Sequence, residues 1–185
     1  FSECDALREL TIPERVDRIG KWAFSTKGAL RVDLRSGRLA QPRLEPQRYY
    51  SYGSQSFCIL PRHVSISRFA AEDKLAAVLG FAELYAKREV MEEEPRQESL
   101  RYIRNSRKRL YSAALEQENL LHVMLTEKMI PKEDMQEMLD RSGQLRHTSQ
   151  TAELLEYQKR YFRALDPAKE IQKQIFDALS QLEAR

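Results

Sequence analysis

The sequence places five cationic side chains within nine residues, in the segment RYIRNSRKR at 101–109. Arginine offers a rigid fork of donors that matches a phosphate or a carboxylate. On a helical wheel Arg101, Arg104 and Lys108 fall together, and Arg109 lies beside them. This cationic ridge predicts salt-dependent contacts with RNA or DNA phosphates, without sequence specificity. The alternative is an ordinary solvated helix face, which is the usual role of a charge run.

Two further charges fall within the apolar arc of the same wheel. Arg107 and Glu118 share that arc with residues such as Leu110 and Leu121. A charge that faces the core of a monomer is costly unless it is paired. We therefore expect Arg107 and Glu118 to be protein-interface residues that face another chain. An arginine stem that carries its charge out to water is the alternative.

Arginine and tyrosine also gather in the segment 43–57, around Arg48, Tyr49, Tyr50 and Tyr52. These residue types are favoured at the energetic centres of protein interfaces. Prolines before and after the segment argue against long regular elements there. The pattern predicts an irregular docking arm that contacts other protein subunits.

Residues suited to catalysis or metal binding are scattered. His63, His122 and His147 are isolated from one another, and Cys4 and Cys58 lack the spacing of a zinc site. The glycine-rich, nucleophile-elbow and metalloprotease motifs are absent from the sequence. We expect no catalytic residue, no cofactor and no metal. A Cys58–His63 pair stays open, as does an enzyme with an unrecognised site.

The N-terminal third of the chain indicates short, irregular elements. Helical spacing of apolar residues predicts two short helices over 1–20. The segment ALRVDLRSGRL alternates apolar and charged residues and turns at Ser36–Gly37, which predicts a β-hairpin over 30–39. A third strand is expected within YYSYGSQSFCILP, because an isolated hairpin is only marginally stable.

From residue 67 onward the apolar residues follow a helical period. We expect one helix ending near MEEE, a long helix over 95–129, a helix that starts at Pro131 and stops at Gly143, one after Ser149, and a last one after Pro167. Glu92, Glu93 and Glu94 suit the N-terminal turn of the long helix. The predicted fold is mainly α, an antiparallel helical bundle or extended helical hairpin over about 67–185, preceded by a small β-hairpin domain over 1–66.

The chain has 185 residues and a formal net charge of +3, so any electrostatic function depends on where the charges lie. No apolar run is long enough for an integral membrane segment. The opening Phe-Ser resembles the new terminus of a processed mitochondrial matrix protein, and the alternative is an arbitrary boundary of the sequence. Together these patterns favour a non-catalytic interaction subunit of a larger multiprotein assembly. The alternative is a nucleic-acid-associated helical protein of ribonucleoprotein type.

Overall fold

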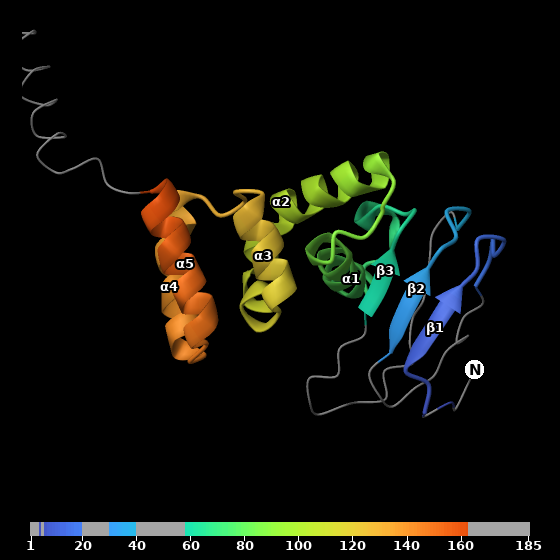
Figure 1. The fold of residues 1–185 in the computed structure, drawn as a ribbon, viewed down its shortest axis with the longest axis horizontal. Coiled ribbons are helices and arrows are strands. Elements are labelled where there is room, and N and C mark those ends of the chain that lie inside the picture. Colours follow the sequence, from blue (N-terminus) through green and yellow to red (C-terminus); the bar gives the residue numbers. More distant parts are fainter. Residues whose placement is uncertain (1–3, 5, 20–29, 40–57, 163–185) are drawn as a thin grey trace, which may run out of the picture. The chain divides into compact units, whose positions relative to one another are not determined.

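The computed structural model describes residues 4, 6–19, 30–39 and 58–162, and this part of the chain is mainly helical with a small sheet (Figure 1). Its strands are β1 (Glu9–Ile12), β2 (Arg31–Leu34) and β3 (Cys58–Pro61). A 3-10 helix (Ile66–Arg68) precedes the α-helices, which are α1 (Lys74–Ala86), α2 (Glu93–Glu116), α3 (Glu118–Thr126), α4 (Lys132–Gln144) and α5 (Thr148–Tyr161).

The chain divides into two compact units, Phe1–Met129 and Ile130–Arg185. The described part of the first unit holds the sheet with α1, α2 and α3, and that of the second holds α4 and α5. The predicted domain boundary near residue 66 stays a prediction. None of the described helices combines the length and the apolar character needed to cross a bilayer.

The sheet is parallel, so the predicted hairpin is wrong. The strands lie in the order β1-β2-β3, and Val32 pairs with Leu10 on one side and with Ile59 on the other. Parallel neighbours need a crossover connection, which a two-residue turn at Ser36–Gly37 cannot provide. Instead of closing a hairpin, Ser36 donates a side-chain hydrogen bond to the backbone carbonyl of Val16.

The alternation of apolar and charged residues that predicted a hairpin has another cause. In β2, Val32, Asp33 and Leu34 are all buried, so the charged position is not a solvent position. Asp33 is buried because an arginine from the neighbouring strand's end neutralises it, as described below. In sequence, a buried parallel strand that contains one ion-paired residue shows the same alternation of apolar and charged residues as an antiparallel strand with one face in solvent.

The short helices predicted over 1–20 are also wrong, because Glu9–Ile12 forms β1. The backbone of β1 is hydrogen-bonded to β2, and this pairing overrides a weak local preference for helix. The strand expected near CILP is confirmed as β3.

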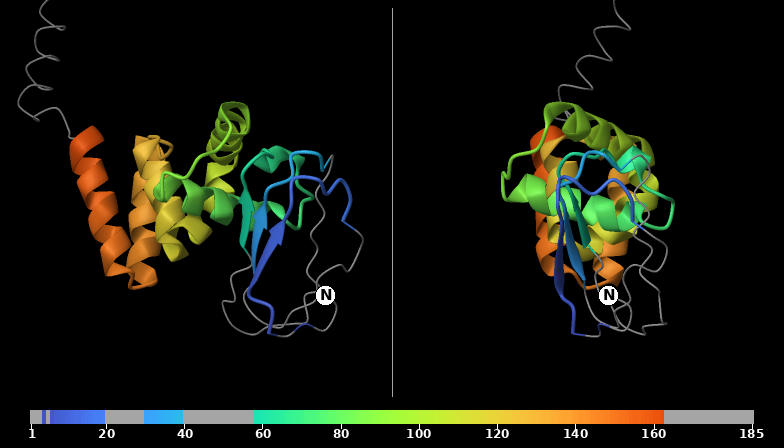
Figure 2. Two further views of the ribbon diagram at one scale, coloured as in Figure 1. Left: turned by 45° about the vertical axis from the view of Figure 1, so that its right-hand side comes forward. Right: turned by 90° about the vertical axis from the view of Figure 1, so that its right-hand side faces the viewer.

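α1 is buried on nearly all sides and packs along β3 (Figures 1 and 2). Its buried residues include Ala77, Val78 and Phe81. At Gly80 the helix approaches the strand so closely that an added Cβ would stand 1.8 Å from the carbonyl oxygen of Ile59. Only glycine permits this distance between helix and strand.

The long helix predicted over 95–129 is two helices, α2 and α3, separated at Gln117. Gln117 has extended backbone angles (φ −124°, ψ 100°) and is the C-cap of α2 and the N-cap of α3. The acidic start of α2 is confirmed, because Glu93 and Glu94 occupy its first turn and favour the positive end of the helix dipole.

In the second unit α4 packs against α5. α4 continues past the predicted stop at Gly143, and Arg146 rather than a glycine adopts the left-handed conformation after it (φ 57°). Ser142 and Thr151 share a 2.6 Å hydrogen bond between the two helices. The helix predicted after Pro167 lies outside the described residues, and an antiparallel bundle over 67–185 stays a prediction.

Candidate nucleic-acid interface and charged clusters

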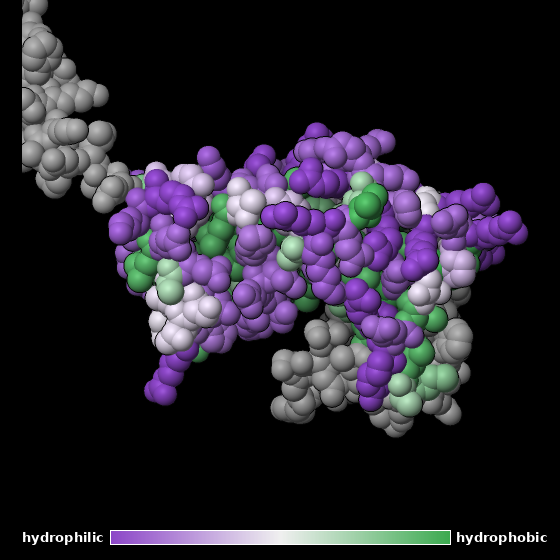
Figure 3. All heavy atoms as spheres, in the orientation of Figure 1, coloured by the Kyte–Doolittle hydropathy of each residue, from purple (hydrophilic) through white to green (hydrophobic). Residues whose placement is uncertain are grey.

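The four residues of the predicted cationic ridge are exposed and lie on one helix. Arg101, Arg104, Lys108 and Arg109 all belong to α2. The apolar stripe of that helix is buried, as its period predicted, through residues such as Leu100, Ile103, Leu110 and Tyr111. Burial of this stripe turns the opposite, cationic side toward solvent. The surface over α2 in Figure 3 is correspondingly hydrophilic.

No carboxylate lies between Ser99 and Leu115, although this stretch of α2 carries all five cations. The helices of the second unit are different. In α4 Arg141 donates to Glu137 at 2.6 Å, and in α5 Arg160 donates to Glu156 at 2.6 Å, both one helical turn apart. Such pairs screen an exposed helix charge. Within the stretch 99–115 of α2 the sequence supplies no carboxylate for a pair of this kind.

One ridge residue reaches another helix. A terminal guanidinium nitrogen of Arg104 lies 3.4 Å from the backbone carbonyl oxygen of Glu127, the C-cap residue of α3. A cation at this position complements the negative end of the helix dipole. The contact is long for a hydrogen bond, and Arg104 keeps an exposed side chain.

The two expected interface charges do not lie together. Arg107 is half-buried, and one of its terminal nitrogens lies 3.5 Å from the carbonyl oxygen of Arg104, one turn back. Glu118 is exposed in the first turn of α3, because the helix break at Gln117 removes it from the wheel of α2. Contact of either residue with another chain stays a prediction. Arg48, Tyr49, Tyr50 and Tyr52 lie outside the described residues.

A charged cluster that the sequence did not reveal joins the ends of β2 and β3. Arg62 donates from Nε to Asp33 at 2.7 Å and from a terminal nitrogen to Glu89 at 2.6 Å. Arg35 donates to the other oxygen of Asp33 at 3.1 Å. Burial lowers the pKa of Arg62, but the hydrogen bonds to Asp33 and Glu89 outweigh it and raise the pKa overall.

A second cluster centres on Glu83 of α1. Arg31 and Lys87 both donate to its Oε1, at 2.8 Å and 2.7 Å. Burial raises the pKa of Glu83, but these two hydrogen bonds outweigh it and lower the pKa overall. The Cys58 thiol lies 3.6 Å from Oε2. Burial, followed by the adjacent carboxylate, raises the pKa of Cys58 to about 12, so the thiolate is scarce at neutral pH.

The structure does not bring Cys58 and His63 together as a hydrogen-bonded pair. Cys58 begins β3 and its thiol contacts Glu83, whereas His63 follows the end of β3. His63 Nδ1 lies 2.8 Å from a carboxylate oxygen of Glu92, the N-cap residue of α2. The two side chains therefore belong to separate clusters.

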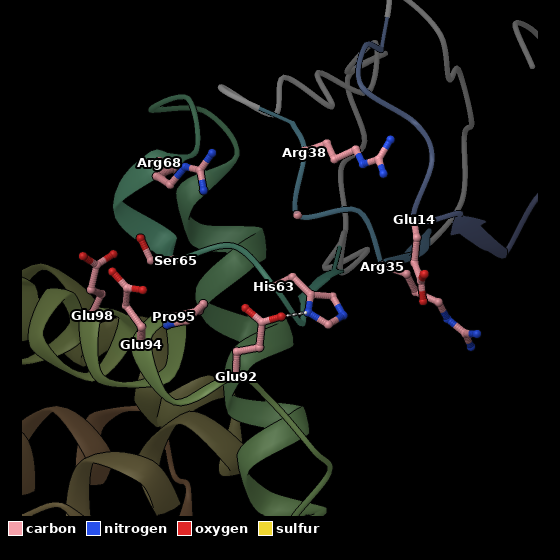
Figure 4. Close-up of a pocket in the computed structure, with 11 residues that line it drawn as sticks. Glu14, Arg35, Arg38, His63, Ser65, Arg68, Glu92, Glu94, Pro95 and Glu98 are labelled. Atoms are coloured by element: carbon pink, nitrogen blue, oxygen red, sulfur yellow. Dashed lines mark hydrogen bonds and ion pairs between the residues drawn. The ribbon is translucent and has the colours of Figure 1, made fainter.

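A hollow of about 660 Å³ opens where β2 and β3 end (Figure 4). The carboxyl ends of parallel strands are a common place for ligand sites, because the connecting loops converge there. Here the lining comes from the segments after β1 and β2, the segment from β3 to the 3-10 helix, and the start of α2, and Glu14 is the residue contributed after β1. The lining also includes the side chains of Arg35, Arg38, His63, Arg68, Glu94 and Glu98.

Sequence reasoning missed this hollow because it assigned the strands to a hairpin. Arg35, Arg38 and His63 each follow a buried strand by a few residues. Had the strands been predicted as parallel, that shared position would have placed all three at one edge of the sheet. The sequence feature that indicates such a site is the recurrence of polar residues just after each strand.

Comparisons with known proteins found no relative of this chain. No protein-family model matches the chain, and neither does any curated protein or any solved structure at a significant level.

Proposed function

We propose that this chain contacts nucleic-acid phosphates through α2, and a non-catalytic interaction subunit of a larger multiprotein assembly is the second candidate function. The observation that supports this most is that four cations, Arg101, Arg104, Lys108 and Arg109, are exposed in a stretch of α2, 99–115, that contains no carboxylate. An exposed cationic helix face attracts a polyanion, and binding releases the counterions that a nucleic acid holds.

The geometry supports contacts to the backbone rather than to bases. A ridge of exposed arginine and lysine side chains on one helix can follow successive phosphates. A platform for stacked bases needs several exposed aromatic side chains. Within α2, Tyr102 is the aromatic residue that lies among the ridge residues in sequence, and it is half-buried with the ammonium of Lys74 5.4 Å from its ring centre. The proposed contact is therefore sensitive to salt and tolerant of sequence.

The test is a gel-shift titration of the full chain with a single-stranded RNA and a duplex DNA at low salt. The variant Arg101→Gln/Arg104→Gln is expected to lose most of the shift, because two of the four ridge charges are gone. The control variant Arg141→Gln/Arg160→Gln removes two arginines that are paired within their own helices. It is expected to bind like the wild type. Equal loss in both variants, or no shift with the wild type, would remove the nucleic-acid proposal.

The second candidate is a contact with other protein subunits. The half-buried Arg107 beside the apolar stripe of α2 favours it, because arginine is common at the centres of protein interfaces. The Arg/Tyr arm around Arg48 and Tyr50 belongs to the same hypothesis. Crosslinking mass spectrometry of the native assembly tests it: crosslinks from one fixed partner to the lysines of α2 and its neighbours support it, and a chain that yields only internal crosslinks opposes it.

A further inference from the structure

The hollow at the carboxyl end of the sheet is lined by charges of both signs (Figure 4). Its arginine wall is Arg35, Arg38 and Arg68 and its glutamate wall is Glu94 and Glu98, while Glu14 beside Arg35 and Glu92 beside His63 also line the space. Arg35 and Arg38 follow β2, and Arg68 ends the 3-10 helix. Glu94 and Glu98 are one turn apart on α2 and therefore lie side by side on that helix. The 3-10 helix packs against α2, where the backbone N–H of Ile66 donates to the hydroxyl of Ser99 at 3.3 Å. This packing holds the cationic and anionic walls around one space.

Within the described part of the chain, the charges of the two walls are only partly used by other residues. Arg68 directs one terminal nitrogen to the carbonyl oxygen of Leu39 at 3.0 Å, and Arg35 uses only Nε on Asp33. Among the described residues, the side chains of Arg38, Glu94 and Glu98 form no ion pair. Guanidinium donors and carboxylate acceptors therefore both remain for a ligand.

The rest of the lining fixes the shape of the hollow. Ser65 and Pro95 are buried and form part of its lining. His63 is tied to Glu92 at 2.8 Å. Gly37 lies so close to His63 that an added Cβ would stand 3.3 Å from the Cβ of the histidine. The charged walls thus stand on a packed floor, and the volume is within the range of about 300–1,000 Å³ typical of small-molecule sites.

Neither a simple anion nor a simple cation suits this pair of walls. An anion drawn to the arginines would also meet the field of Glu94 and Glu98, and a cation drawn to the glutamates would meet Arg38 and Arg68. We propose that the hollow binds a small zwitterion, with its anionic group on the arginine wall and its ammonium group on the glutamate wall. A free amino acid and a short peptide with free termini share this chemistry.

The test is an amide NMR titration of the full chain with trialanine. Three relatives serve as arms: N-acetylated trialanine, C-amidated trialanine and free alanine. Trialanine is expected to shift amides of Gly37, His63 and Ser65, and each cap is expected to weaken binding by up to about fivefold, the equivalent of one partly exposed ion pair. Free alanine binding as tightly as trialanine assigns the site to amino acids, and weaker binding assigns it to peptides.

Paired variants show whether each wall holds the expected group. In Arg38→Gln/Arg68→Gln, amidation of the ligand should cost nothing further, while acetylation should still weaken binding. In Glu94→Gln/Glu98→Gln, acetylation of the ligand should cost nothing further, while amidation should still weaken binding. Arg15→Gln, an exposed arginine of the same unit outside the hollow, should behave as wild type. The proposal is overturned if no lining amide shifts at about 10 mM ligand, a concentration that detects even millimolar affinity. It is also overturned if capped and free peptides bind with the same affinity, or if the paired variants respond to the caps as the wild type does.

Discussion

At the scale of single residues, Gly80 is a position where the packing of α1 on β3 leaves no room for a side chain. Gly80→Ala would place a methyl group against the backbone of β3, 1.8 Å from the carbonyl oxygen of Ile59. Because α1 must then move away from the strand, we expect a loss of about 3 kcal/mol or more in the free energy of unfolding. Denaturant unfolding followed by circular dichroism measures it.

Gly143→Ala is the matched control for this prediction. Gly143 is also helical, but no atom lies within 4 Å of an added Cβ. Alanine there should stabilise the protein by about 0.5–1 kcal/mol, the usual difference between the two residues in a helix. Similar effects of the two substitutions would contradict the close packing of α1 on β3.

The Cys58 thiol supplies a second prediction at this scale. Because burial and then Glu83 raise its pKa to about 12, Cys58 should react slowly with iodoacetamide at pH 8. Glu83→Gln removes the negative neighbour, so it should lower the pKa and speed alkylation. Mass spectrometry of the alkylated peptides measures the rate, and the rate at Cys4 reports whether the variant is still folded. Fast alkylation of Cys58 in the wild type at pH 8 is the result that would count against its burial.

The same raised pKa affects stability in a definite direction. A thiol that ionises near pH 9 when unfolded but near 12 when folded, as Cys58 does, contributes its full stability below pH 9. That contribution is lost as the pH rises from 9 to 12, because only the unfolded chain releases the proton. The free energy of unfolding should therefore decline over this alkaline range.

At the scale of elements, the break between α2 and α3 gives the next prediction. Gln117 is the N-cap of α3, yet its side chain forms no capping hydrogen bond. Serine is a far better N-cap, so Gln117→Ser should raise the free energy of unfolding by about 0.5–1 kcal/mol. Gln117→Ala lacks the hydroxyl and should bring no such gain. If both substitutions have the same effect, the helix does not begin at this position.

Helices were predictable from the sequence where a local signal decides them. The buried stripe of α2 follows from a 3.6-residue period, and its acidic first turn follows from Glu93 and Glu94. The break at Gln117 was missed because no proline or glycine marks it. α1 was placed only roughly, since it ends at Ala86, several residues before the MEEE segment at which the helix was predicted to end.

The sheet was predicted less well because its pairing is not local. Whether β2 lies between two parallel strands depends on residues more than twenty positions away, and a short alternating segment carries no information about them. Asp33 illustrates the difficulty: its partner Arg62 lies 29 residues later, so its burial could not be foreseen. The positions of the cationic ridge residues could be predicted because they all lie on one helix. The hollow lined by arginine and glutamate could not be predicted, because its position depends on the pairing of the whole sheet.

At the scale of the whole molecule, the division at Met129 predicts that the first unit can fold alone. Its core is built from its own strands and helices, through residues such as Val32, Ile59, Phe81 and Tyr111. A chain of residues 1–129 should therefore give a dispersed amide NMR spectrum and a cooperative unfolding transition. A collapsed spectrum without cooperativity would show that α4 and α5 are needed for folding.

The most direct test of the proposed function is the salt dependence of nucleic-acid binding. Fluorescence anisotropy of a labelled single-stranded RNA, titrated with the full chain at several salt concentrations, gives the slope of log K against log salt. Four ridge cations predict a slope of about −3, and Arg101→Gln/Arg104→Gln should reduce it by about 1.4. A wild-type slope near zero, or a slope unchanged in the variant, would contradict the account.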